Sequence, residues 1–316
     1  MLCPQNCHLK PGGVGVCRVR QRIGDKLYTL NYARVSSLGL DPIEKKPLYH
    51  FYPGSLIFSA GTIGCNLACG FCQNWRISQE DAPTRSVTSK ELIKKAEAEK
   101  TAGNIGVAYT YSEPGMWFEY LLDTARLARE FGLKNVMVTN GYLRQEPLAE
   151  LLPCLDAVNM DLKGMSDGFY KRACQGRLEP VLRFAEAVVK AGVHLEITNL
   201  LIPGWNDGDD DLRLLTDWVA GLNPDIPLHL SRYFPQYKFT APETPAATMI
   251  KAYGITRERL NYVYLGNIGA EIGRDTICVS CGAVLIKRQG FQARLVDLAK
   301  NGLCRKCGQS VPVVMD

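Results

Sequence analysis

Short apolar and β-branched runs alternate with amphipathic stretches along most of the chain. The runs that we predict to be strands span residues 55–60, 105–110, 135–139, 157–161, 194–198, 227–231 and 262–265. Segments of helical length separate them, and one begins with the capping-box sequence Thr88-x-x-Glu91. This alternation is typical of a parallel sheet whose strands are joined by crossover helices, so we predict an α/β fold.

Polar residues follow the predicted strands. Glu113 follows the second strand and Asn140 the third. Asp161 ends the fourth strand, Lys163 follows it, and Asn199 follows the fifth. In a β/α barrel, the groups beyond the carboxyl ends of the strands all face one side. Because turns need polar residues anyway, each position alone is weak evidence for a functional site. Together, however, these positions predict a site at that face.

The composition fits one large domain with appendages. The chain has 316 residues, of which 46% are hydrophobic, enough to bury a full core. We expect the α/β domain at residues 53–270, between a cysteine-rich segment at 1–52 and a small module at 271–316.

The charged residues are scattered along the chain, and the net charge is only +5. This charge does not indicate nucleic acid as a partner. No apolar run approaches about 18 residues and no signal-peptide core opens the chain, so we expect no membrane and a cytoplasmic location.

Twelve cysteines are present, and ten of them fall into three groups. Grouped cysteines in a chain of this size indicate metal ligands in a reducing compartment rather than disulfides. The other two, Cys154 and Cys174, we interpret as buried structural thiols.

The central group is Cys65, Cys69 and Cys72, in the pattern CxxxCxxC after the first predicted strand. It supplies three thiolates, one fewer than a cubane iron–sulfur cluster requires. One iron of such a cluster would keep an open position for a substrate or cofactor, and an open position implies chemistry. A tetrahedral zinc site or a coincidence of cysteines is the alternative.

The C-terminal group consists of two CxxC knuckles, Cys278/Cys281 and Cys304/Cys307. Four thiolates close a tetrahedral site and resemble a zinc ribbon, so we expect structural zinc. A segment of this length cannot build a core alone, so the metal would supply its folding energy. An auxiliary iron–sulfur cluster is the alternative.

CxxxCxxC with the aromatic residue Phe71 before the third cysteine resembles the signature of the radical S-adenosylmethionine (radical SAM) superfamily. The resemblance implies a partial (β/α)6 TIM-like barrel over residues 53–270 and a 4Fe-4S cluster whose fourth ligand is S-adenosylmethionine. Electron transfer from the cluster would then cleave this cofactor to a 5'-deoxyadenosyl radical.

Other segments resemble particular branches of this superfamily. Residues 138–141, 161–163 and 203–207 are similar to motifs of pyruvate formate-lyase activating enzymes, whereas 109–114 and 231–235 resemble the radical enzyme of the AmmeMemoRadiSam system. The similarity to the activating enzymes implies a glycyl-radical-enzyme activase that acts on a partner protein. The resemblance to the AmmeMemoRadiSam enzyme implies a small-molecule or metabolite substrate, which we favour.

A third alternative is a non-enzymatic iron–sulfur and zinc protein that transfers electrons or scaffolds a complex. However, three cysteines do not ligate all the irons of a cluster. A radical enzyme would need an electron donor of the flavodoxin or ferredoxin type.

The resemblance also implies roles for the residues at the strand ends. Glu113 would lie beside the cofactor's amino group, or it would instead cap a helix that begins near Pro114. Asn140, Asp161, Lys163 and Asn199 would hold the ribose hydroxyls and the carboxylate. Lys163 is the best carboxylate partner, unless it only pairs with Asp161. Phe71 would pack near adenine or shield the cluster from water.

The N-terminal group is Cys3, Cys7 and Cys17. It resembles a cysteine-rich segment of the same family, in which another cysteine precedes the Leu2-Cys3-Pro4 sequence. That cysteine would fall before Met1. Either the chain starts earlier, or His8 or a distant residue completes a metal site, or no metal binds here.

Overall fold

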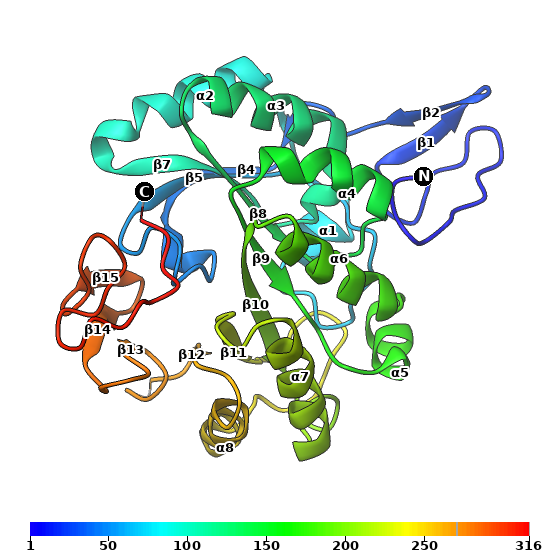
Figure 1. Ribbon diagram of the computed structural model, residues 1–316. Coiled ribbons are helices and arrows are strands. Elements are labelled where there is room, and N and C mark those ends of the chain that lie inside the picture. The colour runs from blue at the N-terminus through cyan, green and yellow to red at the C-terminus, as the bar shows by residue number, and fades with distance from the viewer. Residues whose placement is uncertain (270, 316) are drawn as a thin grey trace.

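The computed structural model describes residues 1–269 and 271–315, and its centre is an open eight-stranded sheet (Figure 1). The strands, in the order β12-β11-β10-β9-β8-β7-β5-β4, are β12 (Val263–Gly266), β11 (Leu228–Arg232), β10 (His194–Leu201), β9 (Ala157–Asp161), β8 (Lys134–Thr139), β7 (Asn104–Tyr109), β5 (Leu56–Gly61) and β4 (Ser37–Pro42). Neighbours from β5 to β12 are parallel, and β4 is antiparallel to β5. All seven predicted strands are present, so the α/β prediction is confirmed. Sequence reasoning missed β4.

Helices cover the outer face of the sheet (Figure 1). They are α1 (Trp75–Ser78), α2 (Ser89–Ala98), α3 (Phe118–Glu130), α4 (Gln145–Leu151), α5 (Asp167–Phe169), α6 (Glu179–Lys190), α7 (Asp209–Leu222) and α8 (Ala246–Arg257). The predicted capping box is formed at the start of α2, where Thr88 Oγ1 accepts from the Glu91 N–H and Glu91 Oε2 accepts from the Thr88 N–H. Each long helix buries its apolar residues against the sheet, which fixes the strands and the loops at their ends.

Short turns of other helix types connect these elements. The 3-10 helices are η1 (Ile43–Lys45), η2 (Lys100–Ala102), η3 (Pro114–Trp117) and η4 (Leu152–Cys154), and η5 (Tyr170–Cys174) is a π-helix. A two-residue pairing joins β3 (Arg34–Val35) to β6 (Arg85–Ser86). The β1 (Arg20–Ile23) and β2 (Lys26–Thr29) hairpin projects from the side of the sheet near the N-terminus (Figure 1).

The C-terminal segment forms a small antiparallel sheet of β13 (Thr276–Ile277), β14 (Val284–Gln289) and β15 (Gln292–Leu295), on the opposite side of the molecule from the β1–β2 hairpin (Figure 1). It packs against β12 in a separate apolar cluster that includes Tyr262, Tyr264 and Leu285. The Leu265 N–H on β12 donates to the carbonyl of Gly273 at 2.8 Å. The C-terminal segment therefore covers the β12 edge of the main sheet.

A buried arginine joins this segment to the sheet. Arg288 on β14 donates to the carbonyl of Tyr49 at 2.7 Å and to Thr276 Oγ1 at 2.8 Å. Its guanidinium lies 4.2 Å from the centroid of the Tyr49 ring and 5.4 Å from that of Tyr264. Because Arg288 is 1% exposed, these contacts are shielded from water and hold the two parts together.

Candidate active site

A cavity of about 810 Å³ lies at the carboxyl ends of the parallel strands. Residues at the carboxyl end of every parallel strand from β5 to β12, or just after it, line the cavity. Lys45 at the end of η1, Lys46 directly after η1, and Arg274 and Phe291 from the C-terminal segment line it too. Such a position is where β/α barrels place their reactive groups. Of the residues predicted for the strand ends, the structure brings Glu113, Asn140, Asp161 and Lys163 to this cavity.

The loop after β5 carries Cys65, Cys69 and Cys72, and all three line the cavity. The loop is anchored to η5, because the Ala68 N–H donates to the Cys174 carbonyl at 2.9 Å. Cys174, which is isolated in the sequence, is buried there against Cys69. A hydrogen bond between these two thiols lowers the pKa of Cys69, whereas burial raises the pKa of Cys65 and of Cys72.

Backbone and amide N–H groups surround the sulfur of Cys65. The Leu67 N–H lies 3.4 Å from Cys65 Sγ, and Asn140 Nδ2 lies 3.5 Å from it. Asn140 Nδ2 also donates to Asn66 Oδ1 at 3.0 Å, while its own Oδ1 accepts from the Tyr142 N–H. The end of β8 and the cysteine loop are therefore held in one network.

Glu113 follows β7 and is 4% exposed. Its Oε1 accepts from Thr139 Oγ1 at 2.7 Å and from the Gly115 N–H at 2.8 Å, and its Oε2 accepts from the Asn140 N–H at 2.9 Å. The bond to Gly115 caps η3, as the structural alternative expected. Burial raises the pKa of Glu113, so a cationic ligand in the cavity would favour its ionised form.

Tyr111, two residues before Glu113, has a left-handed backbone with φ of +72°. This conformation is costly for a tyrosine, and a hydrogen bond of 2.5 Å from Tyr111 Oη to Asp41 Oδ2 on β4 stabilises it. Lys46 Nζ pairs with the same carboxylate oxygen at 2.6 Å. Sequence reasoning missed this link because Asp41 lies in a strand that it did not predict.

Lys163 and Asp161 form an ion pair at the end of β9, with Nζ and Oδ2 3.4 Å apart. Burial alone would lower the pKa of Lys163, but the charges of Asp161 and Cys69 raise it above its ordinary value. Its ammonium also lies 5.9 Å from the centroid of the Phe71 ring. A fixed positive charge therefore stands beside the cysteine loop.

Asn199 is not among the described residues that line the cavity, whereas its neighbours Thr198 and Leu200 are. Successive side chains on a strand point to opposite faces, which explains this placement. Asn199 Nδ2 donates to the Leu162 carbonyl at 2.6 Å, and its buried Oδ1 has no partner among the described residues.

Phe71 lines the cavity and packs between two aromatic rings. Its centroid lies 5.4 Å from that of Phe239 and 6.0 Å from that of Phe169. Trp205 packs against Phe239 in turn, with centroids 4.7 Å apart and the ring planes tilted by 33°. This aromatic layer supports the loop between Cys69 and Cys72.

A buried glutamate on β10 is the main residue of this region that sequence reasoning missed. Glu196 accepts from His229 Nε2 at 2.6 Å, from His194 Nε2 at 3.0 Å, and from the backbone N–H groups of Tyr49 and His50. Burial alone would raise its pKa, but the bonds from the two histidines hold the pKa well below its usual range. A charged residue inside an apolar strand run was the available signal.

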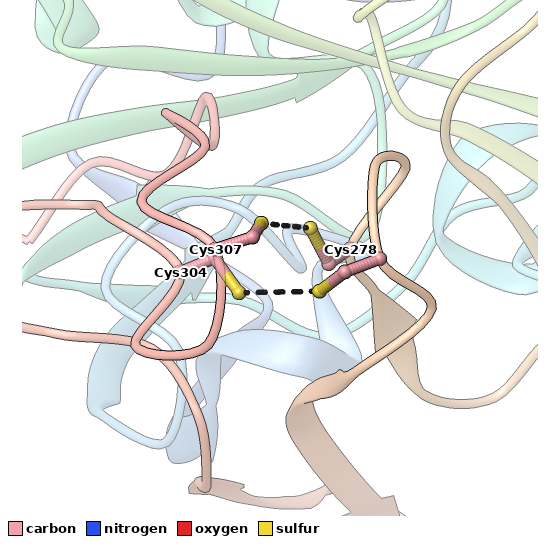
Figure 2. Close-up of side chains that lie close together, drawn as sticks. Cys278, Cys304 and Cys307 are labelled. Atoms are coloured by element: carbon pink, nitrogen blue, oxygen red, sulfur yellow. Dashed lines mark hydrogen bonds between the residues drawn. The ribbon is translucent and has the colours of Figure 1, made fainter.

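The four C-terminal thiols lie together, as predicted for a metal site. All four sulfurs of Cys278, Cys281, Cys304 and Cys307 are within 4.8 Å of one another. The sulfurs pair across two loops, Cys278 with Cys307 at 3.6 Å and Cys281 with Cys304 at 3.7 Å (Figure 2). Within residues 1–269 and 271–315, no other group of three or more metal-ligating side chains is as closely spaced. The arrangement fits one tetrahedral ion.

Comparisons with known proteins agree with this fold and site. The model of the Radical SAM superfamily matches residues 60–215. An uncharacterised protein of Methanocaldococcus jannaschii is 42% identical over 99% of this chain and 95% of its own length. The pyruvate formate-lyase 1-activating enzyme of Escherichia coli is 28% identical over 50% of this chain, and the match spans 66% of that enzyme.

Solved structures show the same fold. SuiB of Streptococcus suis bound to S-adenosylmethionine superposes with a TM-score of 0.55 at 14% identity, over 73% of this chain and 54% of SuiB. The chain belongs to the radical SAM superfamily and is a radical SAM enzyme. Membership implies a 4Fe-4S cluster and S-adenosylmethionine.

The residues at the cavity fit these groups. Thiolates are the ligands that iron–sulfur clusters take, and three of them face the cavity. The carboxylate of Glu113 and the ammonium of Lys163 suit the amino and carboxylate groups of S-adenosylmethionine. Ser112 also lines the cavity, and its buried hydroxyl has no partner among the described residues. An unsatisfied buried hydroxyl is costly unless a ligand completes it.

None of the helices in the described residues combines the length and the apolar character needed to cross a membrane.

Proposed function

We propose that Cys65, Cys69 and Cys72 hold a 4Fe-4S cluster and that the cavity binds S-adenosylmethionine together with a small-molecule or metabolite substrate. When bound, the cluster and cofactor supply a 5'-deoxyadenosyl radical that removes a hydrogen atom from the substrate. The observation that carries the proposal is the three thiols at the cavity formed by all the parallel strand ends.

This chain's residues orient and enclose the bound groups. Glu113 accepts from the cofactor's amino group, and Lys163 binds its carboxylate. Asn140 fixes the sulfur of Cys65, and Asp161 is placed for a ribose hydroxyl. We assign Asn199 to the support of the β9 loop through Leu162 instead.

The walls of the cavity favour a small substrate. Its volume of about 810 Å³ falls in the range of about 300–1,000 Å³ that small-molecule sites occupy. Lys45, Lys46, Arg274 and Phe291 also line it. A compact substrate of the AmmeMemoRadiSam type suits a cavity of this size. A flavodoxin- or ferredoxin-type protein would deliver the electron.

An activase that acts on a partner protein is the second candidate, and the similarity to the E. coli activating enzyme supports it. That match covers half of this chain and 66% of the E. coli enzyme. We also propose that residues 1–52, 53–270 and 271–316 act as a cysteine-rich segment, a catalytic barrel and a zinc-ribbon-like module.

The test is anaerobic reconstitution with iron and sulfide, then dithionite and S-adenosylmethionine, with 5'-deoxyadenosine measured by chromatography. The wild-type chain and Cys154→Ala, which removes a buried thiol away from the cavity, should form the product. Cys69→Ala should form none. Equal product from Cys69→Ala would contradict the assignment. Deuterium transfer from candidate metabolites, against a glycyl-radical signal in a partner protein, then separates the two candidate functions.

A further inference from the structure

The structure brings the three N-terminal cysteines together beside the candidate active site. Cys3 packs against the apolar cluster that contains Cys17. A Cβ atom built on Gly15 would stand 3.6 Å from Cys17 Sγ and 3.7 Å from Cys7 Sγ. The glycine therefore keeps the space between these two sulfurs free of side chain.

Backbone N–H groups point at these sulfurs. The sulfur of Cys3 accepts from the Gln5 N–H, and that of Cys17 accepts from the N–H groups of Val19 and Arg20. Hydrogen bonds to sulfur stabilise the thiolate and tune the potential of iron–sulfur centres.

The other cysteine groups show the same pattern of backbone N–H groups that donate to sulfur. The Leu67 N–H donates to Cys65 and the Asn74 N–H to Cys72, in each case from two residues further along. Cys278 accepts from Ser280 in the same way. Cys3 and Cys17 thus share this local arrangement with cysteines of the two groups already assigned to metals.

Spacing distinguishes the kind of metal centre. The four C-terminal sulfurs, which fit one ion, are all within 4.8 Å of one another, whereas neither three-cysteine group of the described chain is that compact. Thiolates that bind separate irons of one cluster stand further apart than thiolates on a single ion. The N-terminal sulfurs are therefore not arranged around one ion as the C-terminal sulfurs are.

One side chain separates the two three-cysteine groups. Asn66 bonds to the thiol of Cys3, and its Oδ1 lies 4.0 Å from Cys65 Sγ. Gln5 Nε2 also donates to the Asn66 carbonyl at 2.8 Å, which ties the N-terminal loop to the cysteine loop. Cys7 is exposed, whereas Cys69 is buried, so the N-terminal group reaches the surface where a protein donor can approach.

We propose that Cys3, Cys7 and Cys17 bind three irons of a second iron–sulfur cluster, whose fourth iron takes an external ligand, and that this cluster relays electrons from the external donor to the cluster at Cys65, Cys69 and Cys72. One electron passes from a reduced flavodoxin- or ferredoxin-type protein to the second cluster and then inward, and no bond is formed or broken. The relay role rests on the proposed function, whereas the binding of the second cluster does not.

Iron, sulfide and zinc contents of anaerobically reconstituted protein test the binding. The Cys7→Ser/Cys17→Ser variant should lose about four irons per chain relative to wild type, as should a Cys65→Ala/Cys69→Ala/Cys72→Ala variant. Cys154→Ser is the matched control and should lose none. Retained zinc and an unchanged circular dichroism spectrum show that each variant is folded.

The triple variant keeps the test decisive if the N-terminal variant does not fold, because its N-terminal segment is intact. Iron and sulfide that remain in it, with the electron paramagnetic resonance signal of a reduced cluster and with about one zinc per chain to show that the C-terminal cysteines do not hold the iron, support the second cluster. A triple variant without iron and sulfide, or a folded N-terminal variant with the wild-type content, overturns it. If the proposed function fails because Cys65, Cys69 and Cys72 hold no cluster, the triple variant keeps the iron and sulfide content of the wild type. This result differs from both outcomes above.

The relay is tested by the source of electrons. In Cys7→Ser/Cys17→Ser, the ratio of 5'-deoxyadenosine formed with reduced flavodoxin to that formed with dithionite should fall several-fold, since the small reductant needs no relay. The Cys154→Ser control should keep the wild-type ratio. An unchanged ratio in a folded variant that has lost the iron would overturn the relay role.

Discussion

The C-terminal cysteines and the cysteine loop after β5 differ in number, spacing and surroundings. The four sulfurs of the C-terminal site lie within 4.8 Å of one another in a segment with little apolar core of its own. The three cysteines after β5 line a cavity on a large, well-packed sheet. A set of ligands that is complete and compact supports a fold, whereas one that is incomplete and faces a cavity is available for chemistry. The first region should depend on its metal to fold, and the second should fold without it.

The largest expected effect is therefore on the C-terminal site. Cys304→Ser removes one of four ligands, and structural metal sites of this kind contribute about 10–16 kcal/mol of apparent binding energy. We expect loss of zinc and fast amide hydrogen exchange across β13–β15, measured by mass spectrometry. Cys69→Ala should leave exchange in these strands unchanged, although we expect it to abolish product formation. If the amides of β13–β15 exchange as slowly in Cys304→Ser as in the wild type, the C-terminal site does not support folding, and the two sites do not differ in this way.

The Glu196 network comes next, because it lies where the C-terminal segment meets the sheet. Glu196→Gln removes the carboxylate that accepts from two histidines and two backbone N–H groups, and leaving buried hydrogen-bonding groups unsatisfied costs about 1–3 kcal/mol. The control is Glu186→Gln, an exposed position on α6. Denaturant unfolding should show the loss in the first variant alone.

The same pair of variants gives a pH dependence. The pKa of Glu196 is lowered in the folded protein, so its stabilising contribution is present above the unfolded value of 4.5 and is lost as pH falls toward the folded value. The wild type and Glu186→Gln should lose stability steeply below about pH 4.5, and Glu196→Gln should lose less. Parallel curves for all three proteins would show that this carboxyl is not linked to folding.

The smallest expected effect concerns the cavity itself. Tyr111→Phe removes the hydroxyl that bonds to Asp41 and stabilises the left-handed backbone before Glu113. The loss should be about 1 kcal/mol in unfolding free energy, with weaker S-adenosylmethionine binding by equilibrium dialysis. Tyr28→Phe, at an exposed position on β2, should change neither quantity. If Tyr111→Phe changes neither the unfolding free energy nor S-adenosylmethionine binding, the cavity does not depend on this contact with β4.

Much of the fold was predictable because apolar periodicity and strand-end polarity are local signals. The strands from β5 to β12 and the cap at Thr88 follow from neighbouring residues. β4 was not predictable, since Gly39 and Asp41 interrupt its apolar pattern and its partner β5 provides the register. The contacts of Glu196 with Tyr49 and His50 span about 150 residues and have no local signature.

The candidate site divides in the same way. The cysteine groups are legible from spacing alone, and Glu113, Asn140, Asp161 and Lys163 from their position after strands. Which face of the sheet the side chain of Asn199 lies on depends on the alternation of side chains along β10. A shift of one residue would place it on the opposite face. The pairing of Cys174 with Cys69 depends on how η5 packs against the cysteine loop, and no sequence pattern indicates it.

The cover over β12 also bears on how this protein can be divided for experiments. An uncovered sheet edge offers unpaired N–H and carbonyl groups to other chains, and Tyr262 and Tyr264 would become exposed with it. A fragment that ends before residue 271 would therefore tend to self-associate through strand β12 rather than yield a minimal soluble barrel. We therefore expect the C-terminal segment to limit aggregation, in addition to lining part of the cavity.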